Sequence, residues 1–413
     1  MSDQESQRRQ FWVILTIVFL GFIGISMPYL IFPALFLNPA YAILPASWSP
    51  ASHAFFLGLT LAAYPLGQFV GSPILGALSD DYGRKLLLAA SLVISALFNL
   101  LTGIAIEWHH VGLLIVSRFM TGLMEGNVAI ARAMATDLKT ISKHQSLGKI
   151  NASISIAYLI GPFLGGLMTD KGLLEQLTPS MPFYVISVLF VLLAILAMVV
   201  LEKSPLHPLQ EVRTVWQRIN LYRRVSALFT NKQLKLLLLT STAFTLAVDM
   251  FYEFGPVYLT LKWTLGPAQL TLYNGILCLG LAAGNGWLPG FFSSRQSHRR
   301  EILMAMGAFA LSLIGIVIID STLLMLLLFG LCGLAIGLAV TLVTVKISDS
   351  APDTIQGEVM GTQLSLRVLG DAFICLFGSA LLLLSPKIIL IIAAVLTAAT
   401  MVYFRAKEPA LKN

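Results

Sequence analysis

Long apolar runs separated by short polar turns occupy most of the chain, from about residue 11 to residue 404. A helix needs about 20 mainly apolar residues to cross the hydrocarbon of a bilayer, because each residue rises about 1.5 Å. Twelve stretches meet this length. The pattern therefore predicts an all-α membrane protein with spanning helices at 11–37, 52–78, 85–106, 111–137, 146–169, 181–201, 234–261, 269–292, 301–319, 321–346, 357–384 and 386–404.

Composition agrees with a chain whose main solvent is lipid. Hydrophobic residues make up 57% of its 413 residues and charged residues 11%, whereas soluble proteins carry about 25% charged residues. The runs are too long for barrel strands of about ten residues. The first run also exceeds the apolar core of a signal peptide, so we expect it to be retained as a span.

The distribution of basic residues predicts the orientation. Most of the 27 lysines and arginines fall in alternate loops, starting with the N-terminal segment and ending with the C-terminal one. Basic loops stay on the cytoplasmic side, so we expect both termini to be cytoplasmic in a bacterial inner membrane. This bias accounts for the net charge of +7, and we expect no nucleic-acid partner.

A polar stretch at 202–233 divides the chain into two predicted six-helix bundles, 1–201 and 234–413. The stretch contains a possible amphipathic helix around Leu209–Phe229, with basic residues among apolar ones. Such a helix could lie on the anionic inner leaflet. The alternative, which we favour, is a simple tether between the bundles.

Glycines recur at matching places in the two predicted bundles. The pair Gly122 and Gly126 in span 4 recurs as Gly333 and Gly337 in span 10. The spacing from Gly148 to Gly161 likewise recurs from Gly357 to Gly370. Parallel repeats of this kind are typical of transporters whose substrate site lies between the halves, near mid-membrane.

The loop between spans 2 and 3 carries an acid, glycines and a basic pair: Gly76, Asp80, Gly83, Arg84 and Lys85. It resembles the signature loop of the major facilitator superfamily, G-x-L-x-D-x-x-G-R-K. The resemblance implies that family's two-bundle fold with pseudo-symmetric halves. It also implies a cytoplasmic gate, in which Asp80 holds the outward-open state through contacts with the neighbouring half.

Span 5 contains a second motif, formed by Gly161, Pro162, Gly165 and Gly166. Small residues four apart make one helix face thin enough for close packing, and the proline bends the helix. The segment also resembles the antiporter motif G-x-x-x-G-P-x-x-G-G, with Ala157 in place of the first glycine. This resemblance implies a 12-span drug:proton antiporter of the multidrug- or tetracycline-efflux type.

Span 4 carries Arg118, Glu125 and Arg132 at seven-residue intervals, on one stripe of the helix. Arg118 resembles the arginine of the family's R-x-x-x-G motif, which is implicated in proton coupling. Adjacent members lie about 10 Å apart along the axis, so a direct pair needs a bridging partner. We expect Arg132 to reach the cytoplasmic face instead.

Two further pairs of charged residues lie in the second half, Asp249 with Glu253 in span 7 and Arg367 with Asp371 in span 11. Members of each pair are four apart and share a helical face. We favour a static intrahelical ion pair for Arg367 and Asp371. A buried charge costs about 3 to more than 10 kcal/mol, so Glu125, Asp249 and Glu253, with Arg118, are the candidates for proton coupling.

Span 1 contains no acid, although many drug antiporters of the family keep one there, so any coupling is expected to run through spans 4 and 7. Aromatic and polar residues near mid-span could line a cavity for variable organic solutes, although packing or interfacial anchoring is the more common role for any one of them. These cavity candidates are Phe22, Tyr29, Tyr64, Gln68, Asn127, Phe251, Tyr252, Tyr258, Arg367 and Asp371.

The sequence thus predicts a secondary transporter that exports small organic or drug-like solutes by proton antiport. The alternative is a dedicated metabolite or siderophore carrier of the same fold, in which Arg118 and Arg367 bind an anionic substrate. Neither a catalytic constellation nor a nucleotide-binding loop occurs, so we expect no enzyme. We expect no cofactor beyond the proton gradient, no metal, contact with lipid, and a monomer. The three cysteines lack metal-site spacing.

Overall fold

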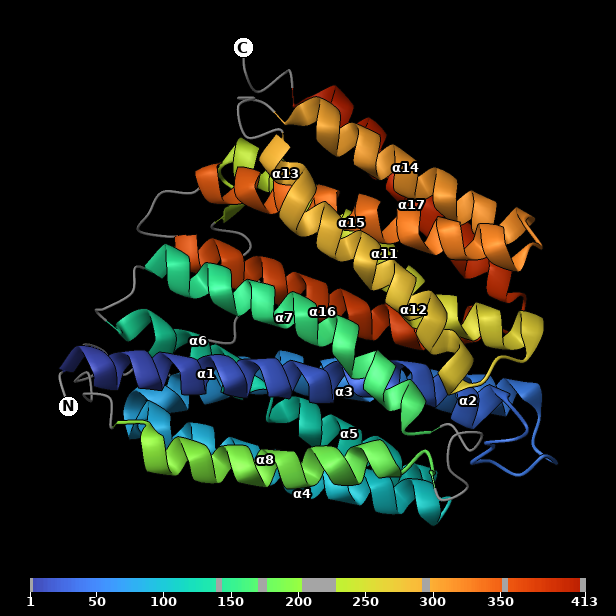
Figure 1. The fold of residues 1–413 in the computed structure, drawn as a ribbon. Coiled ribbons are helices and arrows are strands. Elements are labelled where there is room, and N and C mark those ends of the chain that lie inside the picture. Colours follow the sequence, from blue (N-terminus) through green and yellow to red (C-terminus); the bar gives the residue numbers. More distant parts are fainter. Residues whose placement is uncertain are drawn as a thin grey trace. The chain divides into compact units, whose positions relative to one another are not determined.

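The computed structural model describes residues 3–138, 143–169, 177–202, 228–291, 298–350 and 356–408. Within these ranges every regular element is helical (Figure 1). The elements are α1 (Asp3–Ser26), η1 (Met27–Leu30), α2 (Ile31–Leu37), α3 (Pro50–Tyr82), α4 (Arg84–Glu107), α5 (Val111–Leu123), α6 (Gly126–Asp137), α7 (Lys143–Leu167), α8 (Met181–Val200), α11 (Lys232–Trp263), α12 (Pro267–Ala282), η2 (Ala283–Trp287), α13 (Leu288–Phe291), α14 (Arg299–Ile318), α15 (Thr322–Ser350), α16 (Gln356–Leu381) and α17 (Pro386–Lys407).

The described residues contain nine helices long and apolar enough to cross a membrane. The all-α membrane class is therefore confirmed, whereas the predicted count of twelve spans is not. Predicted span 111–137 is interrupted at Met124 and Glu125, which separate α5 from α6. Predicted span 269–292 is divided by the π-helical turn η2. In α7, the apolar stretch found among the described residues runs from Ile156 to Leu167.

The chain forms two compact units. Unit 1 comprises Met1–Trp48 and Leu59–Ile219, and unit 2 comprises Ser49–Gly58 and Asn220–Asn413. Most of the predicted linker, including most of the amphipathic stretch around Leu209–Phe229, lies outside the described residues. Its structure therefore stays a prediction.

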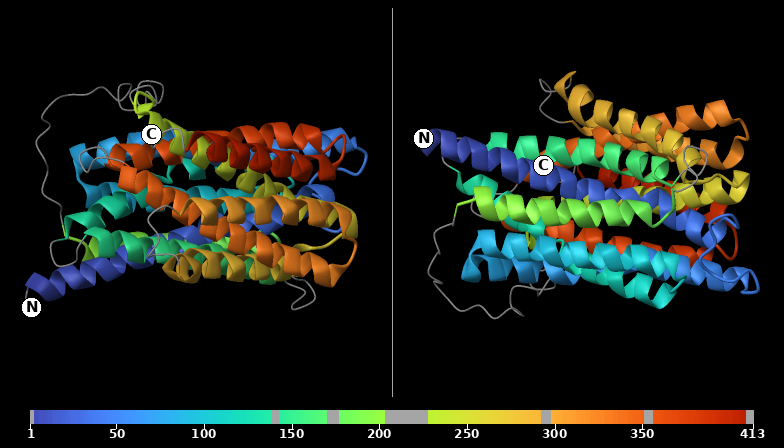
Figure 2. Two further views of the ribbon diagram at one scale, coloured as in Figure 1. Left: turned by 90° about the horizontal axis from the view of Figure 1, so that it is seen from above. Right: turned by 60° about the horizontal axis from the view of Figure 1, so that its bottom comes forward.

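In unit 1, α1 lies along α7 in each view (Figures 1 and 2). The glycines of the antiporter-like motif form this contact. A Cβ atom on Gly161 would collide with Ser26 and lie 2.8 Å from the Ile23 carbonyl oxygen, and one on Gly165 would lie 2.5 Å from that of Met27. The motif therefore has a packing role in this unit, as the thin helix face predicts.

A second close crossing joins α3 to α5 in unit 1. A Cβ atom on Gly67 would collide with the Phe119 carbonyl oxygen, one on Gly71 with that of Leu123, and one on Gly122 with that of Tyr64. Each helix therefore presents glycine to the other's backbone. No larger residue fits this crossing without displacing main chain.

Unit 2 repeats this crossing between α12–η2 and α15. Gly280 and Gly284 face carbonyl oxygens of α15, while Gly333 and Gly337 face those of α12. The recurrence of Gly122 as Gly333, found in the sequence, thus marks equivalent helix crossings. The partners of these glycines on the preceding spans were not predicted, although Gly67 and Gly71 are themselves four residues apart, as are Gly280 and Gly284.

An ion pair closes one end of unit 2, where Lys262 at the end of α11 meets the turn between α14 and α15. Its Nζ donates to the carbonyl oxygen of Ile319 at 2.9 Å and lies 2.6 Å from Asp320 Oδ1. The hydrogen bond and charge of Lys262 hold the pKa of Asp320 below its ordinary value of 3.8.

We expect Asp320→Asn to lower the melting temperature modestly at pH 7, because Asp320 is 85% exposed and its ion pair is screened. A lowered folded-state pKa adds stability above the ordinary value, and this stability is lost as the pH falls through the lowered pKa. The difference from wild type should therefore vanish well below pH 3.8. Thermal unfolding in detergent at both pH values measures this, with Asp349→Asn, at an exposed position in α15, as control. An equal loss at low pH would contradict the ion-pair explanation.

Candidate functional site

Two facing series of polar residues, each at four-residue spacing, run along α11 and α16 in unit 2. We call this set the polar ladder. Because a helix turns every 3.6 residues, each series stays on one face. The ladder consists of Ser241, Thr245, Asp249 and Glu253 on α11, and Gln363, Arg367, Asp371 and Cys375 on α16.

The two sides of the ladder are joined by hydrogen bonds. Gln363 Nε2 donates to Ser241 Oγ at 2.6 Å. One turn further, the Arg367 guanidinium donates through Nε to Asp249 Oδ2 at 3.3 Å and through its terminal nitrogen to Oδ1 at 2.9 Å. Asp249 is 4% exposed, so the arginine supplies charge compensation that the apolar surroundings do not.

The pairing of Arg367 differs from the sequence prediction. We expected an intrahelical pair with Asp371, but the bidentate ion pair of Arg367 joins α16 to Asp249 on α11. The four-residue spacing places Arg367 and Asp371 on one face of the helix. It does not determine which carboxylate the long side chain of Arg367 binds. Asp249 and Glu253 were expected to share a helical face, but they contact different residues of α16. Asp249 contacts Arg367, whereas Glu253 lies beside Asp371 and Cys375.

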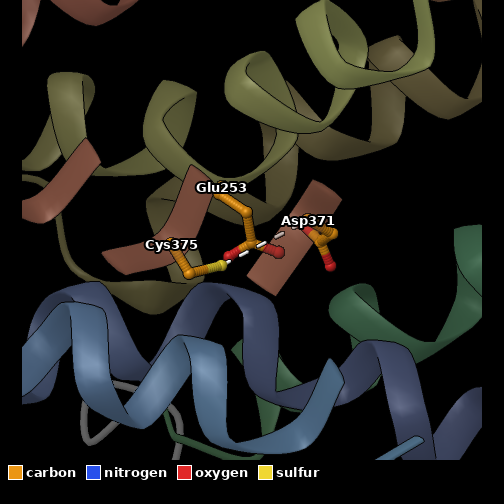
Figure 3. A group of neighbouring side chains, drawn as sticks. All are labelled: Glu253, Asp371 and Cys375. Atoms are coloured by element: carbon orange, nitrogen blue, oxygen red, sulfur yellow. Dashed lines mark hydrogen bonds between the residues drawn. The ribbon is translucent and has the colours of Figure 1, made fainter. Parts of the chain in front are cut away.

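Glu253, Asp371 and Cys375 converge between α11 and α16 (Figure 3). Their carboxylate oxygens and sulfur all lie within 4.8 Å of one another. Cys375 Sγ approaches Asp371 Oδ1 at 4.0 Å. Glu253 is 6% exposed and Cys375 is fully buried. Glu253 and Asp371, two carboxyl groups on different helices, are thus neighbours in the ladder.

This triad changes how the cysteines and acids are interpreted. One thiol and two carboxylates at such distances could ligate a small cation, although no metal was expected from the sequence. The spacing of cysteines could not reveal the triad, because Glu253 lies more than a hundred residues before Asp371. Ser241, Gln363 and Cys375 do carry a sequence signal, because each continues the four-residue spacing of the charged residues on its helix.

A second buried polar group lies in unit 1, at the break between α5 and α6. Tyr64 on α3 donates its hydroxyl proton to Glu125 Oε2 at 2.6 Å. The Arg118 guanidinium carbon lies 4.7 Å from the centroid of the Tyr64 ring and 5.2 Å from that of Phe32. Arg118 and Glu125 were expected to need a bridging partner because of their separation along the helix. Tyr64 contacts both of them and is that partner.

This group combines charges with aromatic faces. A guanidinium between two rings gains cation–π attraction of about 2 kcal/mol when desolvated, and Arg118 is 4% exposed. Tyr64, predicted as a cavity residue, thus contacts both members of the predicted coupling pair. The side chain of Arg132 lies outside the described residues, so its predicted position at the cytoplasmic face stays a prediction.

The other cavity candidates have mixed environments. Phe251 is 1% exposed and packs against Phe309 and Phe329 at ring distances of 5.9 and 5.1 Å. Tyr258 is equally buried and donates to the Ile316 carbonyl oxygen at 3.3 Å. Packing within unit 2 accounts for both side chains without a cavity.

Of the remaining candidates, Phe22 packs on Tyr158, with ring centroids 5.5 Å apart. Asn127 is buried, and Gln68 and Tyr252 are half-buried. The side chain of Tyr29 lies outside the described residues. The cavity role of all five residues therefore stays a prediction.

The predicted gating loop is a sharp connection between α3 and α4. Gly83 has φ of 94° and separates Tyr82, the last residue of α3, from Arg84, the first of α4. Side-chain-bearing residues rarely adopt this conformation, which explains the glycine. A Cβ atom on Gly76 would meet nothing within 4 Å. The side chain of Asp80 lies outside the described residues, and its gating role stays a prediction, as do those of Arg84 and Lys85.

The family of this chain follows from a comparison of its sequence with protein-family profiles. The profile of the Major Facilitator Superfamily matches residues 14–375. The chain belongs to this superfamily. The match includes the signature loop and the glycine crossings of both units. The match supports an integral membrane protein.

Two curated relatives of this superfamily member come from bacteria. Multidrug resistance protein 2 of Bacillus subtilis (strain 168) is 26% identical over 202 residues, which cover 48% of this chain and 46% of the relative. Quinolone resistance protein NorA of Staphylococcus aureus is 28% identical over 148 residues, covering 35% and 36%. The matched stretches thus span less than half of each curated relative.

Solved structures show the superfamily fold over nearly the whole chain. The human organic anion transporter MFSD10 has a TM-score of 0.69 at 18% identity and covers 98% of this chain and 100% of its own. The nucleoside transporter NupG has a TM-score of 0.72 at 14% identity, with 96% and 98% covered. These family members are transporters rather than enzymes, as expected from the sequence.

Proposed function

We propose that this superfamily member is a secondary transporter that exports small organic or drug-like solutes in exchange for protons. The observation that carries the proposal is the polar ladder, in which Asp249 pairs with Arg367 and two further carboxyl groups, Glu253 and Asp371, lie beside each other. Glu253 and Asp371 lie close enough together for one cation to bind both, or for a proton on one of them to relieve their repulsion. Either event lowers the cost of two charges in low dielectric.

This arrangement supports exchange for a simple physical reason. A carboxyl pair that holds a proton in one state and a cationic or dipolar solute in the other cannot hold both at full strength. Binding of one ligand therefore promotes release of the other. The names of the two bacterial relatives, which refer to multidrug and quinolone resistance, agree with a drug-like solute.

The contacts of the buried arginines bear on the alternative, a metabolite or siderophore carrier. That alternative needs Arg118 or Arg367 to bind an anionic substrate. Arg367 is bidentate to Asp249, and Arg118 is stacked between Phe32 and Tyr64. An anion would have to displace a carboxylate already bound to Arg367, so the ladder favours solutes without net negative charge.

The test uses the purified chain in liposomes with a pH-sensitive dye inside. We expect a fluorescent quinolone or an organic-cation dye to drive proton movement that protein-free liposomes do not show. Proton movement driven only by carboxylate metabolites would support the alternative carrier. If neither a quinolone nor an organic cation moves protons under an imposed pH gradient, the antiport proposal is wrong.

A further inference from the structure

A basic cleft opens at one end of α14 and α17 in unit 2. It encloses about 640 Å³ and is lined by His298, Arg299, Arg300, Glu301, Leu303, Met304 and Arg405. Arg299 begins α14, and Arg405 lies in the last turn of α17. Because both helices are candidate spans, the cleft lies where a spanning helix leaves the hydrocarbon and meets the headgroup layer.

Arg299, which lines the cleft, belongs to an ion-pair network. Arg299 donates to the Arg405 carbonyl oxygen at 2.7 Å, and its Nε lies 3.2 Å from Glu408 Oε2. Glu408 also pairs with Lys346. Its charge is therefore shared between two cations, and it does not neutralise the rest of the cleft.

Two arginines remain available for a ligand. Arg300 and Arg405 are exposed and have no side-chain ion pair among the described residues. The cleft and the network together contain two acids, Glu301 and Glu408, and four basic residues, Arg299, Arg300, Lys346 and Arg405. The region around the cleft therefore carries net positive charge. The positive end of the α14 helix dipole adds to this potential.

The remaining wall of the cleft is apolar and continues along the helix. Met304, one turn after Arg300, is 63% exposed, and Leu311 and Ile318 on the same face are each 70% exposed. Their seven-residue spacing makes one continuous apolar track down α14. A soluble anion would use only the arginines, whereas a lipid would use the arginines with its headgroup and the track with an acyl chain.

We propose that this cleft binds an anionic phospholipid, with the phosphodiester between Arg300 and Arg405 and one acyl chain along Met304, Leu311 and Ile318. A basic residue near an anionic membrane surface contributes about 1 kcal/mol, which is about a fivefold change in affinity. The site is separate from the polar ladder, so the proposal does not depend on the transported solute.

The experiment measures lipid retention and thermal stability of the purified full chain in nanodiscs. One set contains only phosphatidylcholine, and the other contains phosphatidylglycerol in addition. We expect phosphatidylglycerol to be enriched beside the protein and to raise its melting temperature. Arg300→Gln and Arg405→Gln should each reduce the enrichment about fivefold. Lys407→Gln is the matched control, because Lys407 is exposed in the same turn of α17 and does not line the cleft.

Two outcomes would overturn the proposal. The first is equal retention of the two lipids, or an equal loss in Lys407→Gln, since either would reduce the effect to general surface charge. The second is full displacement of phosphatidylglycerol by inorganic phosphate, which would assign the cleft to a soluble anion. Circular dichroism of each variant separates loss of lipid from loss of fold.

Discussion

Asp249→Asn is expected to reduce proton-driven transport to the level of protein-free liposomes. Asp249 is buried and holds Arg367 through two hydrogen bonds. Removing one member of a buried ion pair costs about 3 to 5 kcal/mol, because the other charge is left uncompensated. We expect the lower end of this range for stability, since the side chain of Arg367 is 46% exposed.

A double variant separates the structural role of Asp249 from its role in coupling. Replacing both charges, as in Asp249→Asn with Arg367→Gln, leaves no unpaired ion and should recover most of the lost melting temperature. It should not recover proton movement, because we expect the Asp249–Arg367 ion pair to hold Glu253 and Asp371 in the arrangement that exchanges the proton. Quinolone-driven proton flux measured beside thermal unfolding tests both parts. Normal flux in the double variant would remove Asp249 from the coupling mechanism.

Gly280→Ala is expected to destabilise unit 2 strongly. The new methyl group would overlap the carbonyl oxygen of Gly330 on α15, which is main chain and cannot rotate away. Overpacking of this kind costs about 1 to 3 kcal/mol or more. The expected readout is a lowered melting temperature and loss of monodisperse protein after heating in detergent.

The same helix supplies a control for this prediction. A Cβ atom on Gly275 would meet nothing within 4 Å, so Gly275→Ala should be neutral or raise the stability of α12 by up to about 1 kcal/mol. Unit 1 offers a parallel pair, with Gly122→Ala as the damaging change and Gly21→Ala as the control. Similar melting temperatures for Gly275→Ala and Gly280→Ala would contradict the close crossing.

Much of the fold follows from local sequence features. Apolar runs predict spans because each must satisfy its backbone hydrogen bonds internally in lipid. The recurrence of Gly122 as Gly333 predicts equivalent crossings, since a glycine in an apolar helix usually marks close approach. The break at Met124 and Glu125 was not predicted, because neither residue is a strong helix breaker.

The candidate site was only partly predictable. Asp249, Glu253, Arg367 and Asp371 were found because charges are rare in spans. Their pairing was not found, because the helices that carry them are separated by more than a hundred residues and periodicity says nothing of which faces meet. Cys375 gave no signal by itself, and its importance comes from its distance to the two carboxylates.

The π-helical turn η2 has a consequence for homology-based transfer of residue roles. A π turn accommodates one residue more than an α-helical turn, and each helical residue rotates the following side chains by about 100°. Where the corresponding helix of a relative is regular, residues after Trp287 match only across a one-residue gap in the alignment. An ungapped alignment would therefore match side chains that point in directions about 100° apart around the helix.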